Sequence, residues 1–194
     1  MNKMKLVFAT NNLNKLSEIR SLVPLGIEIL SLKDIHCSED LPETNPTLEK
    51  NALQKARYVF DNYGFNCFAD DTGLEIHTLD GEPGVYSARY AGLDCSADNN
   101  IDKVLKKMKN IIDRRAVFRT VISLIINGKF FYFEGQCYGY ITIEKRGTTG
   151  FGYDPIFQPE GYDITFSEMN RDKKGKISHR GDAVRKLLDF FHTM

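Results

Sequence analysis

The strongest constraint on the fold of this chain is a pair of long apolar runs joined by Asn127-Gly128. Residues 117–126 and 130–138 are rich in Val, Ile, Phe and Tyr, which are typical of strands. Asn-Gly between two such runs is the strongest short signal for a β-hairpin, because both residues tolerate the positive φ angles of a tight turn. The middle of the chain is therefore predicted to be a long hairpin within a sheet.

Shorter strands are predicted before this hairpin, at residues 5–9, 27–30 and 66–69, with another strand beginning at Leu74. Helical periods separate them, from Leu13 to Val23 and from Thr47 to Tyr63. This alternation predicts an α/β fold, with a mixed, twisted central sheet flanked by helices.

Two more helices are predicted on either side of the hairpin. The first is capped by Ser96. Its inward-facing residues are expected to be Ile101, Val104, Leu105, Met108 and Ile112. The second ends the chain, and its apolar residues are Val184, Leu187, Leu188 and Phe191.

Length and charge limit the classes of function. The chain has 194 residues, and 26 basic side chains balance 26 acidic ones. This length fits one domain over residues 1–194, built as two lobes. Nucleic-acid and membrane binding rest on a basic excess, so a net charge of zero argues against both as the main task. A local basic pocket for a small polyphosphate is compatible with it.

Four cysteines, Cys37, Cys67, Cys95 and Cys137, are scattered without a C-x-x-C pair or a histidine at zinc-ligand spacing. A disulfide framework or a structural zinc site is therefore not expected. The first five residues lead directly into an apolar run that is too short for a signal peptide or a transmembrane helix. We therefore expect a reduced, cytoplasmic protein.

A candidate anion site follows the first predicted strand, at Thr10-Asn11-Asn12-Leu13-Asn14-Lys15. A strand that feeds a polar turn and a helix N-terminus aims backbone N–H groups at one point. Thr10 and Asn12 can add side-chain donors there, and Lys15 adds a positive charge, so phosphate is the best-suited ligand. The P-loop pattern is absent. The alternative is an ordinary N-capped helix with a solvated lysine.

The paired carboxylates Asp70-Asp71 follow an apolar strand and precede Thr72-Gly73. Two carboxylates buried as charges without a partner would be costly, and a hard divalent cation removes that cost. Oxygen ligands without a Cys/His cluster indicate Mg²⁺ or Mn²⁺ rather than zinc. Adjacent strand residues point to opposite faces, so the two acids are expected to differ in role. The alternative is an Asp-rich turn.

Two further charged residues are candidates for the same site. Glu43 lies in a polar connection before the long predicted helix, and Lys55 lies within that helix. Glu43 can bring a third carboxylate to the metal, and Lys55 can neutralise phosphate. The alternative for each is a solvated surface charge.

Two C-terminal segments have the composition of a base pocket. In Gly150-Phe151-Gly152-Tyr153-Asp154-Pro155, the glycines permit close backbone approach, Phe151 offers a stacking face and Asp154 offers an acceptor. Several donors cluster in residues 174–181, before the last helix. The basic run from Arg171 to Arg180 also suits an RNA-binding patch, but it lacks interleaved aromatic residues. A small anionic ligand fits better.

Six ordered motifs span nearly the whole chain. They are Thr10-x-Asn12-x-x-Lys15, Asn51-Ala52-x-x-Lys55-Ala56, Ala69-Asp70-Asp71-Thr72-Gly73-Leu74, Pro83-Gly84-Val85-Tyr86-Ser87-Ala88-Arg89-Tyr90, Gly150-Phe151-Gly152-Tyr153-Asp154-Pro155-Ile156-Phe157 and Ser178-His179-Arg180-Gly181. In these motifs the chain resembles the inosine triphosphate pyrophosphatase family, also called dITP/XTP pyrophosphatases. The resemblance implies two lobes around a nucleotide-binding cleft and a homodimer. It also implies Mg²⁺-dependent hydrolysis of ITP, dITP and XTP at the α-phosphorus, giving the monophosphate and pyrophosphate.

The resemblance further implies roles for individual residues. Asp71 would be the catalytic residue that accepts a proton from the attacking water, and Glu43, Asp71 and Asp70 would form the acidic metal site. Thr10, Asn12 and Lys15 would hold the phosphates, with Lys55 assisting. The neighbouring residues that would also contact the substrate are Asn11, Leu13 and Asn14. One departure from the family pattern is Lys50, which stands where many members have a glutamate. It leaves the number of metal ions open.

The remaining implied roles concern the base. Thr72 would touch the substrate, Phe151 would stack on the purine, and the residues that would frame it are Gly152, Tyr153 and Asp154. The keto edge would be recognised by Lys174, His179 and Arg180. Hypoxanthine and xanthine would satisfy these donors, whereas the amino group of adenine would face them with another donor.

Three other functions are weighed against this one. The first is a pyrophosphatase of the related septum-inhibitor type, acting on methylated or pyrimidine nucleotides, against which the purine-pocket segments argue. The second is a catalytically silent nucleotide-binding regulator, which would not need Asp70-Asp71 and both lysines. The third, an RNA-binding module, is disfavoured by the neutral net charge.

Overall fold

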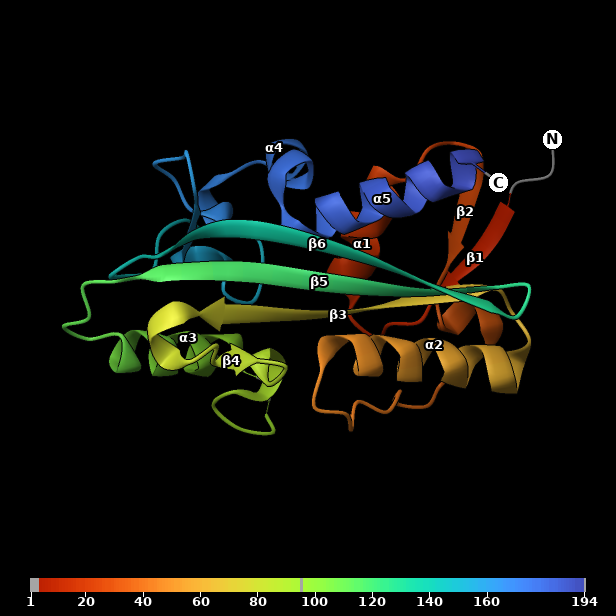
Figure 1. Ribbon diagram of the computed structural model, residues 1–194, viewed down its shortest axis with the longest axis horizontal. Helices are drawn as coiled ribbons and strands as arrows, with labels where there is room; N and C mark the ends of the chain where they lie inside the picture. Colours follow the sequence, from red (N-terminus) through yellow and green to blue (C-terminus); the bar gives the residue numbers. More distant parts are fainter. Residues whose placement is uncertain (1–3, 95, 194) are drawn as a thin grey trace. The chain divides into compact units, whose positions relative to one another are not determined.

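The computed structural model describes residues 4–94 and 96–193. Strands and helices alternate in its first part, a long hairpin follows, and two helices end the chain (Figure 1). The strands are β1 (Met4–Phe8), β2 (Ile27–Leu30), β3 (Cys67–Ile76), β4 (Pro83–Gly84), β5 (Arg115–Ile126), β6 (Lys129–Ile141) and β7 (Phe157–Pro159). The α-helices are α1 (Leu13–Leu22), α2 (Leu48–Tyr63), α3 (Ala97–Lys107), α4 (Arg171–Ile177) and α5 (His179–Thr193). Short 3₁₀ helices cover residues Lys33–Ile35, His77–Leu79, Ser87–Arg89, Asp154–Ile156 and Phe166–Glu168.

The strands form one mixed sheet in the order β2-β1-β3-β5-β6-β7, with β4 paired to β3. β1 is parallel to both β2 and β3, with Phe8 opposite Phe68. β4 is antiparallel to β3, and β7 is antiparallel to β6. The mixed sheet flanked by helices that the sequence predicts is confirmed.

The hairpin between β5 and β6 turns at the predicted dipeptide. Asn127 has a φ of 50° and Gly128 a φ of 73°, which is the pair of positive angles that a type I′ turn requires. Both strands run a few residues beyond the predicted limits. Hydrophobic alternation weakens at strand ends, so boundaries are the least predictable part of an element.

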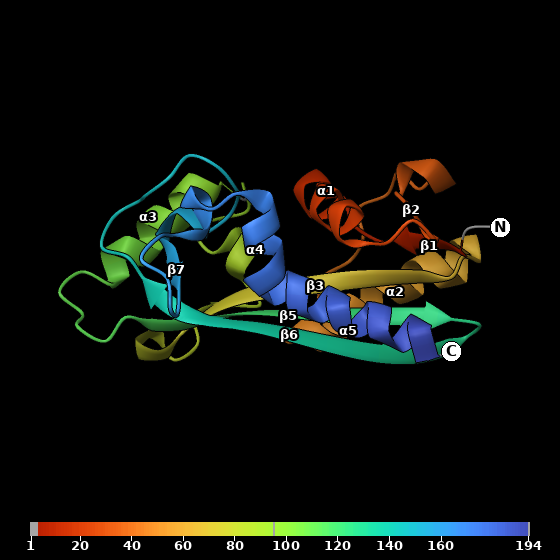
Figure 2. The same ribbon diagram turned by 90° about the horizontal axis from the view of Figure 1, so that it is seen from above.

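The described residues fall into two compact units. The first unit comprises the described residues of 1–71, 120–135 and 181–194. Its strands are covered on one face by α1 and α5, where Leu16 and Val184 pack with Phe68. The other face is covered by α2, where Val59 packs with Cys67. In Figure 2 α5 lies over β5 and β6, and Figure 1 shows α2 on the opposite side of these strands.

The second unit comprises the described residues of 72–119 and 136–180. Its core is rich in aromatic rings: Phe118 lies against Phe157, with ring centroids 4.6 Å apart, and Phe166 packs beside both. The inner face of α3 joins this core through Ile101 and Val104. β3, β5 and β6 each contribute residues to both units. Each unit nevertheless has a hydrophobic core of its own.

One prediction about β3 is wrong. The sequence predicted a strand over residues 66–69, polar residues at its end and a new strand from Leu74, whereas β3 is continuous from Cys67 to Ile76. Aspartate is depleted in strands, so Asp70-Asp71 suggested a break. Both carboxylates instead bind partners on helices that pack against the strand, and these tertiary contacts override the local preference.

Ile112 was also predicted wrongly. It is 97% exposed, whereas Ile101, Val104 and Met108 are buried as expected. The helix ends at Lys107, so Ile112 lies beyond the last turn and outside the helical period that would have carried it inward.

The described cysteines, Cys37, Cys67 and Cys137, are buried free thiols, and Cys95 lies outside the described residues. The first three residues of the chain lie outside them as well. Within residues 4–94 and 96–193, every helix is too short or too polar to cross a membrane.

Candidate active site

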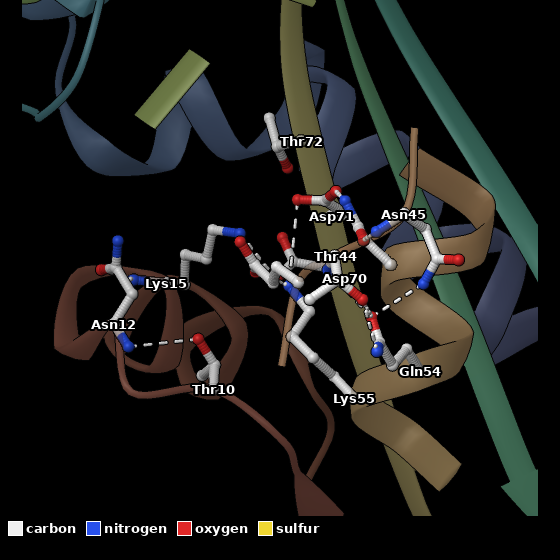
Figure 3. A network of polar contacts seen from close by, with 12 residues as sticks. Thr10, Asn12, Lys15, Thr44, Asn45, Gln54, Lys55, Asp70, Asp71 and Thr72 are labelled. Carbon is white, nitrogen blue, oxygen red and sulfur yellow. Dashed lines mark hydrogen bonds and ion pairs between the residues drawn. The ribbon is translucent and has the colours of Figure 1, made fainter. Parts of the chain in front are cut away.

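The turn that precedes α1 is closed by its own side chains. The Asn12 Oδ1 atom accepts hydrogen bonds from the backbone N–H groups of Asn14 (3.0 Å) and Lys15 (3.1 Å). The Thr10 hydroxyl accepts from the Asn12 N–H at 3.1 Å (Figure 3). Asn12 is therefore the N-cap of α1. An N-capped helix with a solvated lysine was the alternative to an anion site in the interpretation of the sequence.

The other half of that interpretation, a solvated lysine, is wrong. Lys15 donates from Nζ to the Asp70 carboxylate at 2.9 Å, and its side chain is 15% exposed. The Asn11 side-chain amide donates to the Asp40 carboxylate at 3.2 Å. The side chain of Leu13 is largely exposed, and Asn14 is exposed as well. The residue of this turn that reaches the paired carboxylates is thus Lys15.

The two aspartates of β3 point in opposite directions, as strand alternation predicts. Asp70, which is 0% exposed, faces the side of α1 and binds Lys15. Asp71, which is 7% exposed, faces α2: it accepts from the Asn51 side-chain amide at 3.2 Å, and Lys55 Nζ lies 3.8 Å away. Two neighbouring carboxylates are thereby balanced by lysines from two different helices.

Lys55 joins two carboxylates. Its buried ammonium contacts Glu43 by a short hydrogen bond and lies within ion-pair distance of Asp71. Burial alone would favour the neutral amine, but attraction by Asp71, Glu43 and Asp70 outweighs it, and the pKa of Lys55 lies above its ordinary value. The amine therefore stays charged.

The two acids that share Lys55 respond differently to it. Burial raises the pKa of Glu43, but the charge and hydrogen bond of Lys55 outweigh that effect, and the net pKa is lowered. For Asp71 burial dominates the opposing attraction of Lys55 and Lys15, so its pKa is raised. A carboxylate with a raised pKa is a better proton acceptor, which suits a general base.

The donor set of this region fits a hard divalent cation. Glu43 and Asp71 already hold one cation in common, the Lys55 ammonium, and both present only oxygen ligands. Within the part of the chain that the structure describes, groups of three or more His, Cys, Asp or Glu side chains able to hold a metal are absent. Mg²⁺ usually takes one or two carboxylates and completes its shell with water and substrate phosphate, so two are enough.

Sequence reasoning missed two residues of α2 in this region. Asn51 and Gln54 hydrogen-bond the segment that carries Glu43, and Asn51 also reaches Asp71. Asn51 had been noted only as part of a motif. One signal was available: Asn51 and Lys55 are four residues apart, which places them on one helix face beside the apolar stripe.

In the second unit, the predicted base-pocket residues gather around Phe151. The buried Asp154 carboxylate accepts from the Phe151 N–H at 2.8 Å and from Lys174 Nζ at 2.7 Å. Lys174 Nζ lies 4.8 Å from the centroid of the Phe151 ring, and the Arg180 guanidinium lies 5.6 Å from it. Arg180 also donates to the Thr72 hydroxyl at 3.2 Å.

The other predicted pocket residues have structural contacts. The His179 ring stacks on Phe118, with centroids 4.4 Å apart, and the Tyr153 hydroxyl donates to the Ser87 carbonyl at 2.8 Å. Gly152 has a φ of 60°, a conformation that favours glycine.

The basic run is divided between the surface and the interior. Lys174, His179 and Arg180 are buried, on α4 and at the start of α5, whereas Arg171, Lys173 and Lys176 are exposed. The three side chains predicted to recognise the base are therefore the buried ones.

The model of the Ham1 family matches residues 6–190. The chain belongs to the Ham1 family. Among its relatives, the dITP/XTP pyrophosphatase of Flavobacterium johnsoniae is 56% identical over 186 residues, covering 96% of this chain and 97% of that protein. The dITP/XTP pyrophosphatase of Porphyromonas gingivalis is 52% identical over 187 residues, covering 96% of each. The family expected from the sequence motifs is thus confirmed.

Solved Ham1 structures share the fold of this chain. A HAM1 protein from Coxiella burnetii superimposes with a TM-score of 0.90 at 36% identity, covering 98% of this chain and all of the other. The Ham1 protein of Staphylococcus aureus gives a TM-score of 0.88 at 38% identity, covering 97% and 98% of the two chains.

Proposed function

We propose that this Ham1 protein hydrolyses non-standard purine nucleoside triphosphates (ITP, dITP and XTP) at the α-phosphorus, releasing pyrophosphate and leaving the monophosphate. The observation that carries the proposal is the buried Asp71 carboxylate, which shares the Lys55 ammonium with Glu43. The relatives named dITP/XTP pyrophosphatase match nearly the whole chain. The consequence in the cell is removal of these nucleotides from the nucleotide pool.

The proposed cofactor is Mg²⁺, for which Mn²⁺ can substitute. Glu43 and Asp71 would hold it, and Asp70 would support them as a further acid. Bound there, the cation would lower the pKa of a coordinated water and neutralise phosphate charge. Lys15 and Lys55 are already paired with Asp70 and Glu43. A divalent cation that offsets phosphate charge would therefore favour binding of the nucleotide, so cation and nucleotide are expected to bind together.

The reaction needs a base and neutralisation of the leaving group. Asp71 takes the proton of the attacking water, because burial raises the pKa of its carboxyl group above the ordinary value and so makes it a better proton acceptor. Lys15 and Lys55 donate to phosphate oxygens and stabilise the charge that builds on the pyrophosphate. Thr10, Asn12 and the N-terminal turn of α1 provide the remaining phosphate contacts. A base of this kind contributes about 10²–10⁴-fold.

Base selectivity is assigned to the second unit. Phe151 stacks on the purine, and Arg180, His179 and Lys174 direct donors at the keto oxygen. An adenine amino group would leave these donors unsatisfied, at about 1–3 kcal/mol for each buried group. The Lys174 ammonium is already bound to Asp154. Of Arg180, His179 and Lys174, it therefore contributes least directly to recognition of the base.

A substrate panel tests the proposal. The purified protein is incubated with ITP, XTP, GTP and ATP, with and without Mg²⁺, and the products are identified. We expect pyrophosphate and the monophosphate from ITP and XTP, only with the cation, and little turnover of ATP. Binding without turnover would indicate a silent regulator, and equal turnover of ATP would contradict the keto-edge account.

We also propose a cytoplasmic homodimer. The free thiols of Cys37, Cys67 and Cys137 support a reducing compartment. Tyr86 is 56% exposed, and the guanidinium of Arg89 lies 5.2 Å from its ring centroid. Exposed Tyr and Arg side chains are enriched in protein interfaces. Light scattering at several concentrations distinguishes the dimer from a monomer.

A further inference from the structure

The segment that carries Glu43 is held against α2 by side chains of that helix. The Gln54 Oε1 atom accepts from the Thr44 N–H at 3.1 Å and from the Asn45 side-chain amide at 2.7 Å. Gln54 Nε2 donates back to the Thr44 hydroxyl at 3.0 Å. Figure 3 shows Gln54 beside Asn45 and Thr44. A polar connection with no regular structure is thereby fixed to a helix.

Asn51 provides the link from this segment to Asp71. It is 0% exposed, and its Oδ1 atom accepts from the Asn45 backbone N–H at 2.8 Å. A backbone N–H can only donate, so the opposite end of the amide, Nδ2, must point the other way. There it donates to Asp71 Oδ2 at 3.2 Å. The orientation of the amide is thus set by its partners.

Given the proposed function, on which this inference rests, we propose that Asn51 is a positioning residue that fixes the Asp71 carboxylate relative to the segment carrying Glu43. The two acids assigned to the metal come from different elements, β3 and the connection before α2. Asn51 contacts both of these elements through directed hydrogen bonds, beside the ammonium of Lys55, which lies between the two carboxylates themselves. It sets their separation before the nucleotide and the cation arrive.

If Asn51 no longer holds the two acids in place, both the catalytic rate and the metal affinity should fall. A reacting group that is displaced by about 1 Å loses on the order of 100-fold in rate. Residues that orient metal ligands typically change metal affinity by about 10–100-fold. Asn51 acts on both acids, whereas Gln54 acts only on the segment with Glu43. The two residues should therefore have separable effects.

The test uses two variants of α2 and one control. Asn51→Asp keeps the size of the side chain and the acceptor for the Asn45 N–H, but turns a carboxylate oxygen toward Asp71. Gln54→Ala releases Thr44 and Asn45 and leaves the contact between Asn51 and Asp71 intact. Asn62→Asp makes the same change as the first variant at an exposed position of α2, where the side chain bonds only its own helix.

Steady-state kinetics with ITP provide the first readout. For Asn51→Asp we expect kcat to fall on the order of 100-fold, with KM within about threefold of the wild-type value. For Gln54→Ala we expect kcat at saturating Mg²⁺ to stay near the wild-type value. The Mg²⁺ concentration for half-maximal activity should rise about tenfold. Asn62→Asp should change neither quantity.

Hydrogen exchange of backbone amides, measured by NMR without metal or nucleotide, gives a readout independent of activity. The Asn45 amide should stay protected in Asn51→Asp and lose protection in Asn51→Ala. The Thr44 amide should lose protection in Gln54→Ala. If Asn51→Asp does not fold, Asn51→Ala replaces it in the kinetic comparison, with the same expected fall in kcat.

Three results would overturn the inference. The first is a folded Asn51 variant with kcat within about threefold of the wild type. The second is an equal loss in Asn62→Asp, and the third is an Asn45 amide that remains protected in Asn51→Ala. A wild-type protein that releases no pyrophosphate from ITP would overturn the proposed function instead, and the exchange of the Asn45 amide then decides whether Asn51 holds the segment.

Discussion

Asp70 and Asp71 are consecutive residues of β3 whose carboxylates bind side chains from two different helices. Asp70 pairs with Lys15 of α1 at 2.9 Å, and Asp71 accepts from Asn51 of α2 at 3.2 Å. The strand separates the two acids by its alternation, and the helices give each a distinct environment. Asp71 is therefore the acid whose surroundings suit a base, and Asp70 is the acid that holds Lys15.

Replacing Asp71 tests this division. We expect Asp71→Asn to lower kcat for ITP by at least about 10²-fold, because an amide cannot accept the proton of the attacking water. The fold should persist, since Lys55 keeps Glu43 as its partner. The control is Asp61→Asn, an exposed position on the same helix as Lys55. A folded Asp71→Asn protein within tenfold of wild-type activity would remove Asp71 from the role of base.

The buried ion pair between Lys174 and Asp154 in the second unit leads to a prediction about the free energy of unfolding. Lys174→Met leaves the Asp154 carboxylate buried without its ammonium partner, so the free energy of unfolding should fall by about 3–5 kcal/mol. Adding Asp154→Asn to the Lys174→Met variant removes the unpaired buried carboxylate. This double variant should therefore recover part of the lost free energy of unfolding. Urea denaturation of the two single variants and the double variant measures this coupling. Strictly additive effects would contradict it.

The arginine beside Phe151 makes a prediction about selectivity. In Arg180→Gln the side chain can accept as well as donate, so an adenine amino group no longer faces only donors. We expect the ratio of kcat/KM for ITP to that for ATP to fall about 10–100-fold, which corresponds to one unsatisfied buried group. Arg185→Gln, at an exposed position of α5, is the matched control. An unchanged ratio in Arg180→Gln would contradict the assignment of Arg180 to the keto edge.

The buried Cys67 thiol leads to a prediction about how the free energy of unfolding changes at alkaline pH. Burial raises the pKa of Cys67 from 9.0 to about 12, so above pH 9 only the unfolded chain loses this proton. The stability contributed by the thiol is complete below pH 9. It is lost as pH rises toward 12, by about 1.4 kcal/mol per pH unit.

Cys67→Ser removes this titration, and its hydroxyl can still donate to the Ala56 carbonyl, which Cys67 reaches at 3.1 Å. Urea denaturation between pH 8 and 10.5 should therefore give a shallower loss of stability in the variant than in the wild type. Equal slopes would show that Cys67 does not titrate differently in the folded and unfolded chains.

Local chemistry predicted much of the fold. Asn127-Gly128 located the central turn because positive φ angles are a property of the two residues themselves. The continuity of β3 could not be predicted in this way. Asp70 and Asp71 disfavour a strand locally, and the contacts with Lys15 and Asn51 that offset this preference come from distant parts of the sequence.

The same distinction applies to the candidate site. Lys15, Lys55 and Glu43 were candidates from their residue types, but a charged residue in a sequence does not reveal whether its side chain is solvated or paired. Asn51 carries no charge and was noted only as part of a motif, without a role. Its importance arises from its complete burial and from two partners, neither of which is visible before the chain is folded.

The position of water attack tests the central claim most directly. The wild-type protein is incubated with ITP and Mg²⁺ in water enriched in ¹⁸O, and the products are analysed by mass spectrometry. Attack at the α-phosphorus, with Asp71 as the base, predicts one ¹⁸O atom in the monophosphate and none in the pyrophosphate. Label in the pyrophosphate, or release of orthophosphate and IDP, would contradict the account.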